Sequence, residues 1–253
     1  MKGTKLALIG HEEKNRTLKS RLHKKNKSIL ITSPITTFVY VETFRKLAFR
    51  IYAEMKKKGQ KILLVSSVEE NEGKSTIASN IALAMAQSGK KVILVDLDMR
   101  RPAIYKIFDI ESKEDNGFWK EEIPIVGQHT MQLYLNKKVI KNPAVFMKEK
   151  RIGALLKQGR EKADIIIVDS PPMNAAADAE LVLSYADASI LVVRKDWVHI
   201  NDLNRAIDVL GKGDTECLGY VLNDYEIRKP VSRGKDGYYY GYGYGTYRKE
   251  IGR

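Results

Sequence analysis

The sequence contains one cysteine, Cys217, and seven prolines, and none of its apolar runs is long. A single cysteine excludes a disulfide framework and a cysteine-ligated metal cluster. Runs such as Ile-Ile-Ile-Val are far too short to span a bilayer. No secretory signal is visible, because the opening MKGTKLALIG soon gives way to charged residues. These absences predict a cytoplasmic protein. Its length of 253 residues suits one large domain or two small ones.

Positive charge is abundant, and the formal net charge is +13. Residues 1–27 hold nine lysines and arginines against Glu12 and Glu13. Such a segment could lie on anionic lipid or nucleic acid, or it could be a solvated basic arm. No motif for reading DNA or RNA accompanies the charge, so we expect no nucleic-acid partner.

Short apolar strands alternate with helical patterns through the middle of the chain. Strands are predicted at 61–66, 91–96, 164–169, 188–193 and 217–223, and helices at 40–59, 75–89, 144–162, 178–186 and 200–211. This alternation predicts an α/β fold with a mostly parallel sheet flanked by helices. Residues 103–148 are less regular and are interpreted as a connecting segment. We therefore expect a basic arm over 1–37, one domain over 38–228 and a flexible tail over 229–253.

The stretch VSSVEENEGKST joins the first predicted strand to the following helix and ends as a phosphate-binding loop would. Its backbone N–H groups and the helix N-terminus would hold a polyphosphate, Lys74 would reach the outer phosphates, and the Ser75 hydroxyl would face Mg²⁺. Val68 stands where the usual pattern has its first glycine, and Asn71 suits a left-handed turn. The nearby carboxylates of Glu69, Glu70 and Glu72 must point away. The plainer alternative is an ordinary helix start.

Three aspartates follow apolar strands at the predicted carboxyl edge of the sheet. Asp96 and Asp98 are two residues apart, so in extended chain both point to one face, and Asp169 ends another strand. Ligands of such sheets bind at this edge. Three carboxylates beside a polyphosphate favour a divalent cation between them, and one of them could act as a base. Any single one could instead cap a turn.

Six tyrosines spaced by glycine fall within ten residues near the end of the sequence. They are Tyr238, Tyr239, Tyr240, Tyr242, Tyr244 and Tyr247. Glycine at this density disfavours both helix and strand, so we expect a flexible segment. The composition alone also fits a low-complexity tail without a chemical role.

These motifs together resemble the bacterial tyrosine kinases (BY-kinases) of capsule and exopolysaccharide assembly. The resemblance runs over nearly the whole chain after about residue 30. It rests on EGKST as Walker A, ILVDLDMRRP as the family's second motif (Walker A′), IIIVDSPP as Walker B, and the tyrosine cluster. It implies a P-loop NTPase fold of the ParA/MinD-like deviant Walker class. ParA/MinD-type positioning ATPases share part of this pattern and remain the alternative, and a nucleic-acid-binding ATPase is supported only by the charge.

The resemblance also implies roles for individual residues. ATP would bind at Asn71, Glu72, Gly73, Lys74, Ser75 and Thr76, with Asn223 contacting the base. Lys74 would neutralise phosphate charge, while Ser75, Asp98 and Asp169 would hold Mg²⁺. Asp96 would accept the proton of a tyrosine attacking the γ-phosphate, and the six clustered tyrosines would be the acceptors. Together they describe an ATP-dependent protein-tyrosine autokinase that regulates polysaccharide synthesis or export.

The resemblance further implies partners and a location. Stand-alone members of the family are activated by a separate membrane-embedded polysaccharide co-polymerase, so we expect recruitment to the inner face of the cell membrane, helped by the basic N-terminal segment. A cognate phosphatase and a second copy of the chain are the other expected partners. The family's Glu-x-x-Arg-x-x-Arg interface motif appears here as Glu42, Arg45 and Ala48, so self-association is expected to be weak. The family's usual Pro-Gly is replaced by Glu70-Asn71.

Overall fold

The computed structural model describes residues 5–11, 29–111, 118–125, 129–175, 177–211 and 214–226. Within these residues eight strands form one sheet with the order β1-β8-β7-β2-β6-β3-β5-β4. The strands are β1 Lys5–His11, β2 Ile62–Ser67, β3 Val92–Asp96, β4 Phe118–Ile125, β5 His129–Asn136, β6 Ile165–Asp169, β7 Ala188–Arg194 and β8 Glu216–Glu226. All described pairings are parallel except β4 with β5. The predicted α/β class is confirmed.

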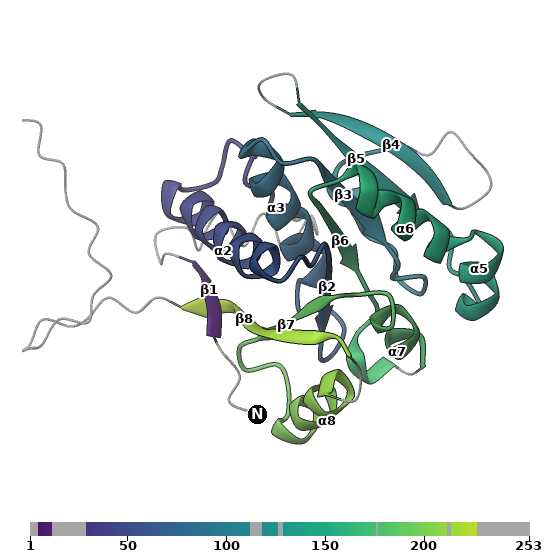
Figure 1. Ribbon diagram of the computed structural model, residues 1–253. Helices are drawn as coiled ribbons and strands as arrows, with labels where there is room; N and C mark the ends of the chain where they lie inside the picture. The colour runs from purple at the N-terminus through teal and green to yellow at the C-terminus, as the bar shows by residue number, and fades with distance from the viewer. Residues whose placement is uncertain are drawn as a thin grey trace, which may run out of the picture.

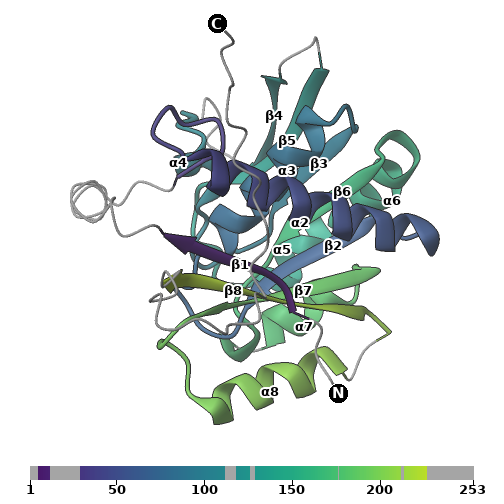
Figure 2. The same cartoon turned by 90° about the vertical axis from the view of Figure 1, so that its left-hand side faces the viewer.

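Helices cover both faces of the sheet (Figures 1 and 2). They are α2 Phe38–Lys57, α3 Lys74–Gln87, the short α4 Ile104–Ile107, α5 Pro143–Glu149, α6 Ile152–Lys162, α7 Ala177–Leu183 and α8 Ile200–Gly211, with a 3₁₀ turn at Met173–Ala175. One apolar core lies between the sheet and the pair α2 and α3, and another lies under α5 to α8. Alternate residues of β2 serve the two cores, which explains why its pattern is continuously apolar.

Helix α3 packs beside α2 and against the central strands of the sheet, and its composition suits that position. Twelve of its residues are buried, and half of them are alanine or serine, whose small side chains let α2 approach closely. Helix α2 is amphipathic by contrast, burying Phe44, Leu47, Ile51 and Met55 at helical spacing. Its N-cap is Thr37, whose hydroxyl accepts from the amide of Tyr40 at 3.2 Å. This two-helix layer fixes the start of α3, where the phosphate-binding loop ends.

The segment 103–148, interpreted from the sequence as a connection, contains α4, the antiparallel pair β4 and β5, and the start of α5. That interpretation was wrong because β4 is an edge strand. It alternates exposed and buried residues and carries Pro124 and several charges, which weakens an apolar signal. Strand β1 lies inside the segment predicted as a basic arm and pairs in parallel with β8. Among the described residues, no helix combines the length and apolar character needed to cross a membrane.

Candidate active site

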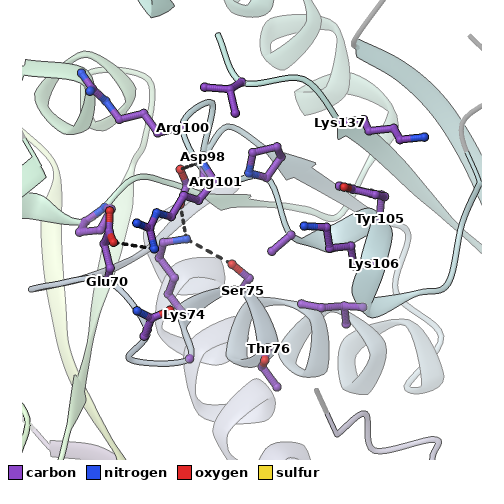
Figure 3. Close-up of a pocket in the computed structure, with 17 residues that line it drawn as sticks. Glu70, Lys74, Ser75, Thr76, Asp98, Arg100, Arg101, Tyr105, Lys106 and Lys137 are labelled. Carbon is purple, nitrogen blue, oxygen red and sulfur yellow. Dashed lines mark hydrogen bonds and ion pairs between the residues drawn. The ribbon is translucent and has the colours of Figure 1, made fainter. Parts of the chain in front are cut away.

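A cavity of about 640 Å³ opens where the loop after β2 meets the carboxyl edge of the sheet. One wall is the loop and the first turn of α3, with Gly73, Lys74, Ser75 and Thr76. The opposite wall comes from the segment after β3 and from the end of β5, and carries Arg101, Tyr105, Lys106 and Lys137. Figure 3 shows Lys74 rising from the loop toward Asp98 between these two walls. Segments distant in sequence therefore converge on one hollow.

The loop turns through two left-handed residues. Asn71 has φ of 63°, in agreement with the turn predicted for it, and Gly73 has φ of 90°. A Cβ on Gly73 would lie 2.5 Å from Nδ2 of Asn223, so only glycine fits there. Gly73 precedes α3 without a side-chain cap, which leaves the first amides of the helix available to an anion.

Side chains on the side of the loop away from the cavity hold its backbone in place. The buried carboxylate of Glu72 points away from the cavity and accepts from the amides of Glu69 at 2.6 Å and Arg194 at 2.8 Å. Burial raises the pKa of Glu72, although these hydrogen bonds oppose the shift. Nδ2 of Asn223 donates to the carbonyl oxygen of Glu72 at 2.7 Å. Asn223 thus braces the loop from behind and is not among the cavity-lining residues.

Two further residues that sequence reasoning missed hold the loop from the end of β7. The guanidinium of Arg194 donates to the carbonyl oxygen of Asn71 at 3.3 Å and forms an ion pair with Asp224 at 3.1 Å. It also lies over the ring of Trp197, whose indole N–H donates to the carbonyl oxygen of Glu70 at 3.1 Å. No motif marks these positions, and the parallel pairing of β2 with β7 brings them to the loop.

Lys74 is 8% exposed and is surrounded by acceptors. Its Nζ lies 2.5 Å from Oδ2 of Asp98, 3.5 Å from Oδ1 of Asp169 and 3.2 Å from Oγ of Ser75. Burial opposes its charge, but the attraction of Asp169 and Asp98 prevails and raises the pKa of Lys74 above its usual value. A permanently charged ammonium therefore stands at the point where a polyphosphate would meet the loop.

Asp169 has the least satisfied carboxylate of the site. It is fully buried at the end of β6, and neither of its oxygens accepts a hydrogen bond of normal geometry. Burial raises the pKa of Asp169, against the opposing pull of Lys74. Hard oxygen ligands such as these, with the Ser75 hydroxyl beside them, suit Mg²⁺ that takes its remaining ligands from water and phosphate. The residues present therefore fit a magnesium ion bound together with a nucleotide.

Of the three aspartates only Asp98 lines the cavity, so the expectation that Asp96 and Asp98 share one pocket is not met. Asp96 pairs with Asp169 across β3 and β6, and like Asp169 it is fully buried. One oxygen accepts from the amide of Asp98 at 3.1 Å, and the other accepts from Ala103 and Ile104 at 3.0 Å. Burial raises the pKa of Asp96 strongly. Its carboxylate holds the segment 97–104 in the shape that presents Asp98 and Arg101 to the loop.

The mouth of the cavity carries exposed ion pairs. Arg100 forms an ion pair with Asp178 at 2.5 Å, and Arg101 forms one with Glu70 at 2.7 Å. The expectation that Glu70 points away is therefore wrong, since its carboxylate lies at the cavity rim (Figure 3). The structure thus brings Asn71, Lys74, Ser75 and Asp98 together around the cavity. The six clustered tyrosines lie outside the described residues.

Comparison with known proteins places these features in a family. The ParA family model, described as NUBPL iron-transfer P-loop NTPase, matches residues 58–249. The tyrosine-protein kinase YwqD of Bacillus subtilis is 27% identical over 207 residues, which are 79% of this chain and 86% of that protein. A tyrosine-protein kinase of the cps region of Klebsiella pneumoniae is 25% identical over 85% of this chain, which spans only 31% of that longer protein.

A solved structure supports the same fold. The kinase domain of the Escherichia coli tyrosine kinase ETK aligns with a TM-score of 0.71 at 23% identity, covering 95% of both chains. At this identity the likeness shows the fold alone. The resemblance to bacterial tyrosine kinases read from the motifs is confirmed by the named relatives.

Proposed function

Because the chain belongs to the ParA family of P-loop NTPases, and because its curated relatives are named tyrosine-protein kinases, we propose that it is an ATP-dependent protein-tyrosine autokinase. One observation carries the proposal. The buried ammonium of Lys74 lies at the start of α3 within reach of Asp98, two residues after the end of β3, and of Asp169, at the end of the neighbouring strand β6. This arrangement supplies the positioned charges that phosphoryl transfer requires.

The site residues divide the work between them. The amides of 71–76 and the start of α3 would hold the phosphates of ATP, and Lys74 would neutralise charge as it develops on the transferred group. Magnesium held by Ser75, Asp98 and Asp169 would supply further charge neutralisation. Asn223 would contact the base only after its amide releases the carbonyl oxygen of Glu72, since it does not line the cavity in the described structure. A loop braced by Glu72, Arg194 and Trp197 needs little reorganisation on binding, which favours transfer.

Asp96 is the proposed acceptor of the tyrosine proton. In the described structure its two oxygens hold three backbone amides. It would therefore have to release one amide when the phenol enters, and its high pKa would suit the proton that it gains. The acceptors are the tyrosines between 238 and 247. Each phosphate adds roughly −1.5 to −2 charges at neutral pH, so a modified tail should no longer dock beside bound phosphate.

The physiological role proposed for the chain follows from its relatives. We propose regulation of capsular or exopolysaccharide synthesis, in line with the cps region named for the Klebsiella relative. A membrane-embedded activator would recruit the chain to the inner face of the membrane, and a phosphatase would reverse the modification. Iron transfer, which the family description names, is less suited to this chain. It has one cysteine, whereas iron–sulfur clusters are held by several cysteine thiolates.

Incubation of the purified chain with Mg-ATP, followed by phosphotyrosine detection, tests the proposal. We expect labelling of the wild type and none of Lys74→Met, because the charge that meets the phosphates is removed. Lys157→Met, an exposed lysine on α6, serves as the matched control and should label normally. Phosphotyrosine at the wild-type level in Lys74→Met would refute the site.

A positioning ATPase of the ParA/MinD type is the second candidate, because it shares the fold family of this chain. That class usually carries a lysine early in the loop, where this chain has the fully buried Val68. A chain that hydrolyses ATP but never labels its tyrosines, even with a membrane activator present, would belong to this second class.

A further inference from the structure

The ion pair between Glu70 and Arg101 crosses the mouth of the candidate active site. Glu70 lies on the phosphate-binding loop, and Arg101 lies on the segment that follows β3. Nη1 of Arg101 is 2.7 Å from Oε2 of Glu70. The two side chains retain 61% and 43% of their accessible surface, so the pair is exposed to solvent. Figure 3 shows Arg101 between Glu70 and Asp98, beside the ammonium of Lys74.

Arg101 is held in this place by the same network that positions Lys74. Its backbone amide donates to Oδ1 of Asp98 at 2.9 Å, and Oδ2 of the same carboxylate contacts Lys74 at 2.5 Å. Asp98 therefore couples the main chain of Arg101 to the residue that meets the phosphates. A guanidinium attached to this point can turn to a bound polyphosphate while its backbone stays fixed.

The negative charge of Glu70 disfavours anion binding unless a cationic side chain neutralises it. Its carboxylate lines the cavity that the phosphates would enter, and like charges there would repel. An exposed ion pair contributes little free energy, so Arg101 loses little by leaving Glu70. A hydrogen bond from a guanidinium to a phosphate is stronger, and it becomes available only when a nucleotide arrives.

We propose that Arg101 is a phosphate-binding residue of this site, and that the carboxylate of Glu70 pairs with the Arg101 guanidinium until a nucleotide displaces it. This inference rests on the proposed nucleotide-dependent function and adds to it a competition at the mouth of the cavity. Glu70 acts as an internal competitor, which weakens the affinity of the resting site for nucleotide. The residue pair Glu70-Asn71 thereby gains a role beyond shaping the loop.

Titration with a fluorescent methylanthraniloyl-ATP and Mg²⁺ measures the competition without relying on catalysis. We expect Glu70→Gln to tighten binding by about two- to five-fold, since it removes an exposed ion pair and its repulsion. Arg101→Gln should weaken binding by about ten-fold, the loss expected for a charge-assisted contact to phosphate. Glu69→Gln is the matched control, because it removes the same charge one residue away, where the side chain contacts Asn174 and not Arg101. It should bind within two-fold of the wild type, as roughly neutral surface changes do.

The double variant Glu70→Gln/Arg101→Gln separates competition from simple repulsion. If Glu70 acts by occupying Arg101, its removal should tighten binding less once Arg101 is gone. An equal gain in both backgrounds, an unchanged affinity in Glu70→Gln, or equal gains in Glu69→Gln and Glu70→Gln would each overturn the inference. A wild type that binds no nucleotide would instead refute the proposed function, so the two failures are distinguishable.

Discussion

At the scale of single residues, the buried carboxylate of Asp169 lowers the stability of the fold but suits the proposed magnesium site. A fully buried carboxylate without a normal hydrogen bond destabilises the fold, and burial raises its pKa accordingly. Lys74 offsets part of this cost, but Asp98 lies closer to the same ammonium. Such a residue is expected where a ligand supplies the missing contact. The orphaned oxygens thus support the proposed magnesium site on grounds independent of the motif.

Replacement of Asp169 by asparagine should therefore stabilise the nucleotide-free chain while it abolishes transfer. We expect a melting temperature about 2–4 °C higher at neutral pH, which corresponds to about 1 kcal/mol for a chain of this size. The sign follows from linkage. Because the pKa of Asp169 is raised in the folded chain, the folded chain still binds this proton at a pH where the unfolded chain has released it. The stability of the wild type therefore falls as the pH rises from the usual aspartate pKa through the raised pKa.

Thermal unfolding of both proteins at acidic and neutral pH checks this expectation. The advantage of the Asp169→Asn variant should vanish near pH 3, where both states of the wild type are protonated. A variant that melts below the wild type at neutral pH would show that the ion pair with Lys74 outweighs the cost of burial.

The residues of the site differ in how far the sequence could predict them. Lys74, Ser75 and Asp98 lie at fixed spacings in local motifs, and they do line the cavity. Arg194 and Trp197 could not be predicted, because their contacts depend on the pairing of β7 with β2. The carboxylate of Glu70 was misplaced for the same reason, since its partner Arg101 comes from another loop.

At the scale of elements, continuously buried strands and amphipathic helices were predictable, and edge elements were not. The apolar runs of β2, β3 and β6 have no other physical interpretation, since both of their faces are covered. Strand β4 has one neighbour and carries charges on its exposed face, so its pattern is close to that of a loop. The predicted boundaries at 37/38 and 228/229 stay predictions.

Helix α2 carries the altered interface motif and bears on self-association. Arg45 is paired with Glu42 on the same helix at 2.8 Å, and Ala48, in the position of the second arginine, is 3% exposed within the core. Phe49 beside it is 73% exposed, on a groove of about 540 Å³ between α2 and α3. Of the described residues that line this groove, Phe49 is the one largely exposed apolar side chain, and no arginine stands at position 48, which is little for a stable interface.

We therefore expect the isolated chain to sediment as a monomer at micromolar concentration. Sedimentation velocity of the wild type and of Phe49→Ser should give the same species. A stable assembly of the wild type that Phe49→Ser dissolves would show that the apolar groove replaces the missing arginine contacts, and the expectation of weak association would then be wrong.

At the scale of the whole molecule, the position of the last strand decides where a following tail can reach. The carboxyl end of β8 lies on the edge of the sheet that holds the phosphate-binding loop, and Asn223 of this strand contacts the loop directly. Strand β5, whose end contributes to the far wall of the cavity, is five strands away in the sheet. At about 4.8 Å per strand this is roughly 24 Å. The tail would therefore start on one side of the loop, while the cavity opens on the other.

We propose that transfer occurs between chains. The residues from 227 to 236 span at most about 35 Å when fully extended, and a path around the chain's own loop to the first clustered tyrosine would use most of that length. To reach the cavity of a neighbouring chain, the tail would not have to pass around its own loop. We accordingly expect deletion of residues 237–253 to remove nearly all autophosphorylation while nucleotide binding and basal hydrolysis persist. Because the deleted segment is rich in glycine and poor in core-forming residues, stability should change little.

A mixture of this truncated, catalytically intact chain with full-length Lys74→Met tests the direction of transfer. Phosphotyrosine on the inactive full-length partner demonstrates transfer between chains, because that partner cannot label itself. If the mixture stays unlabelled while the wild type labels itself, transfer occurs within one chain. Retention of most of the label on the truncated chain alone would place the acceptors elsewhere. In that case the described Tyr105, which lines the cavity, is the first residue to replace.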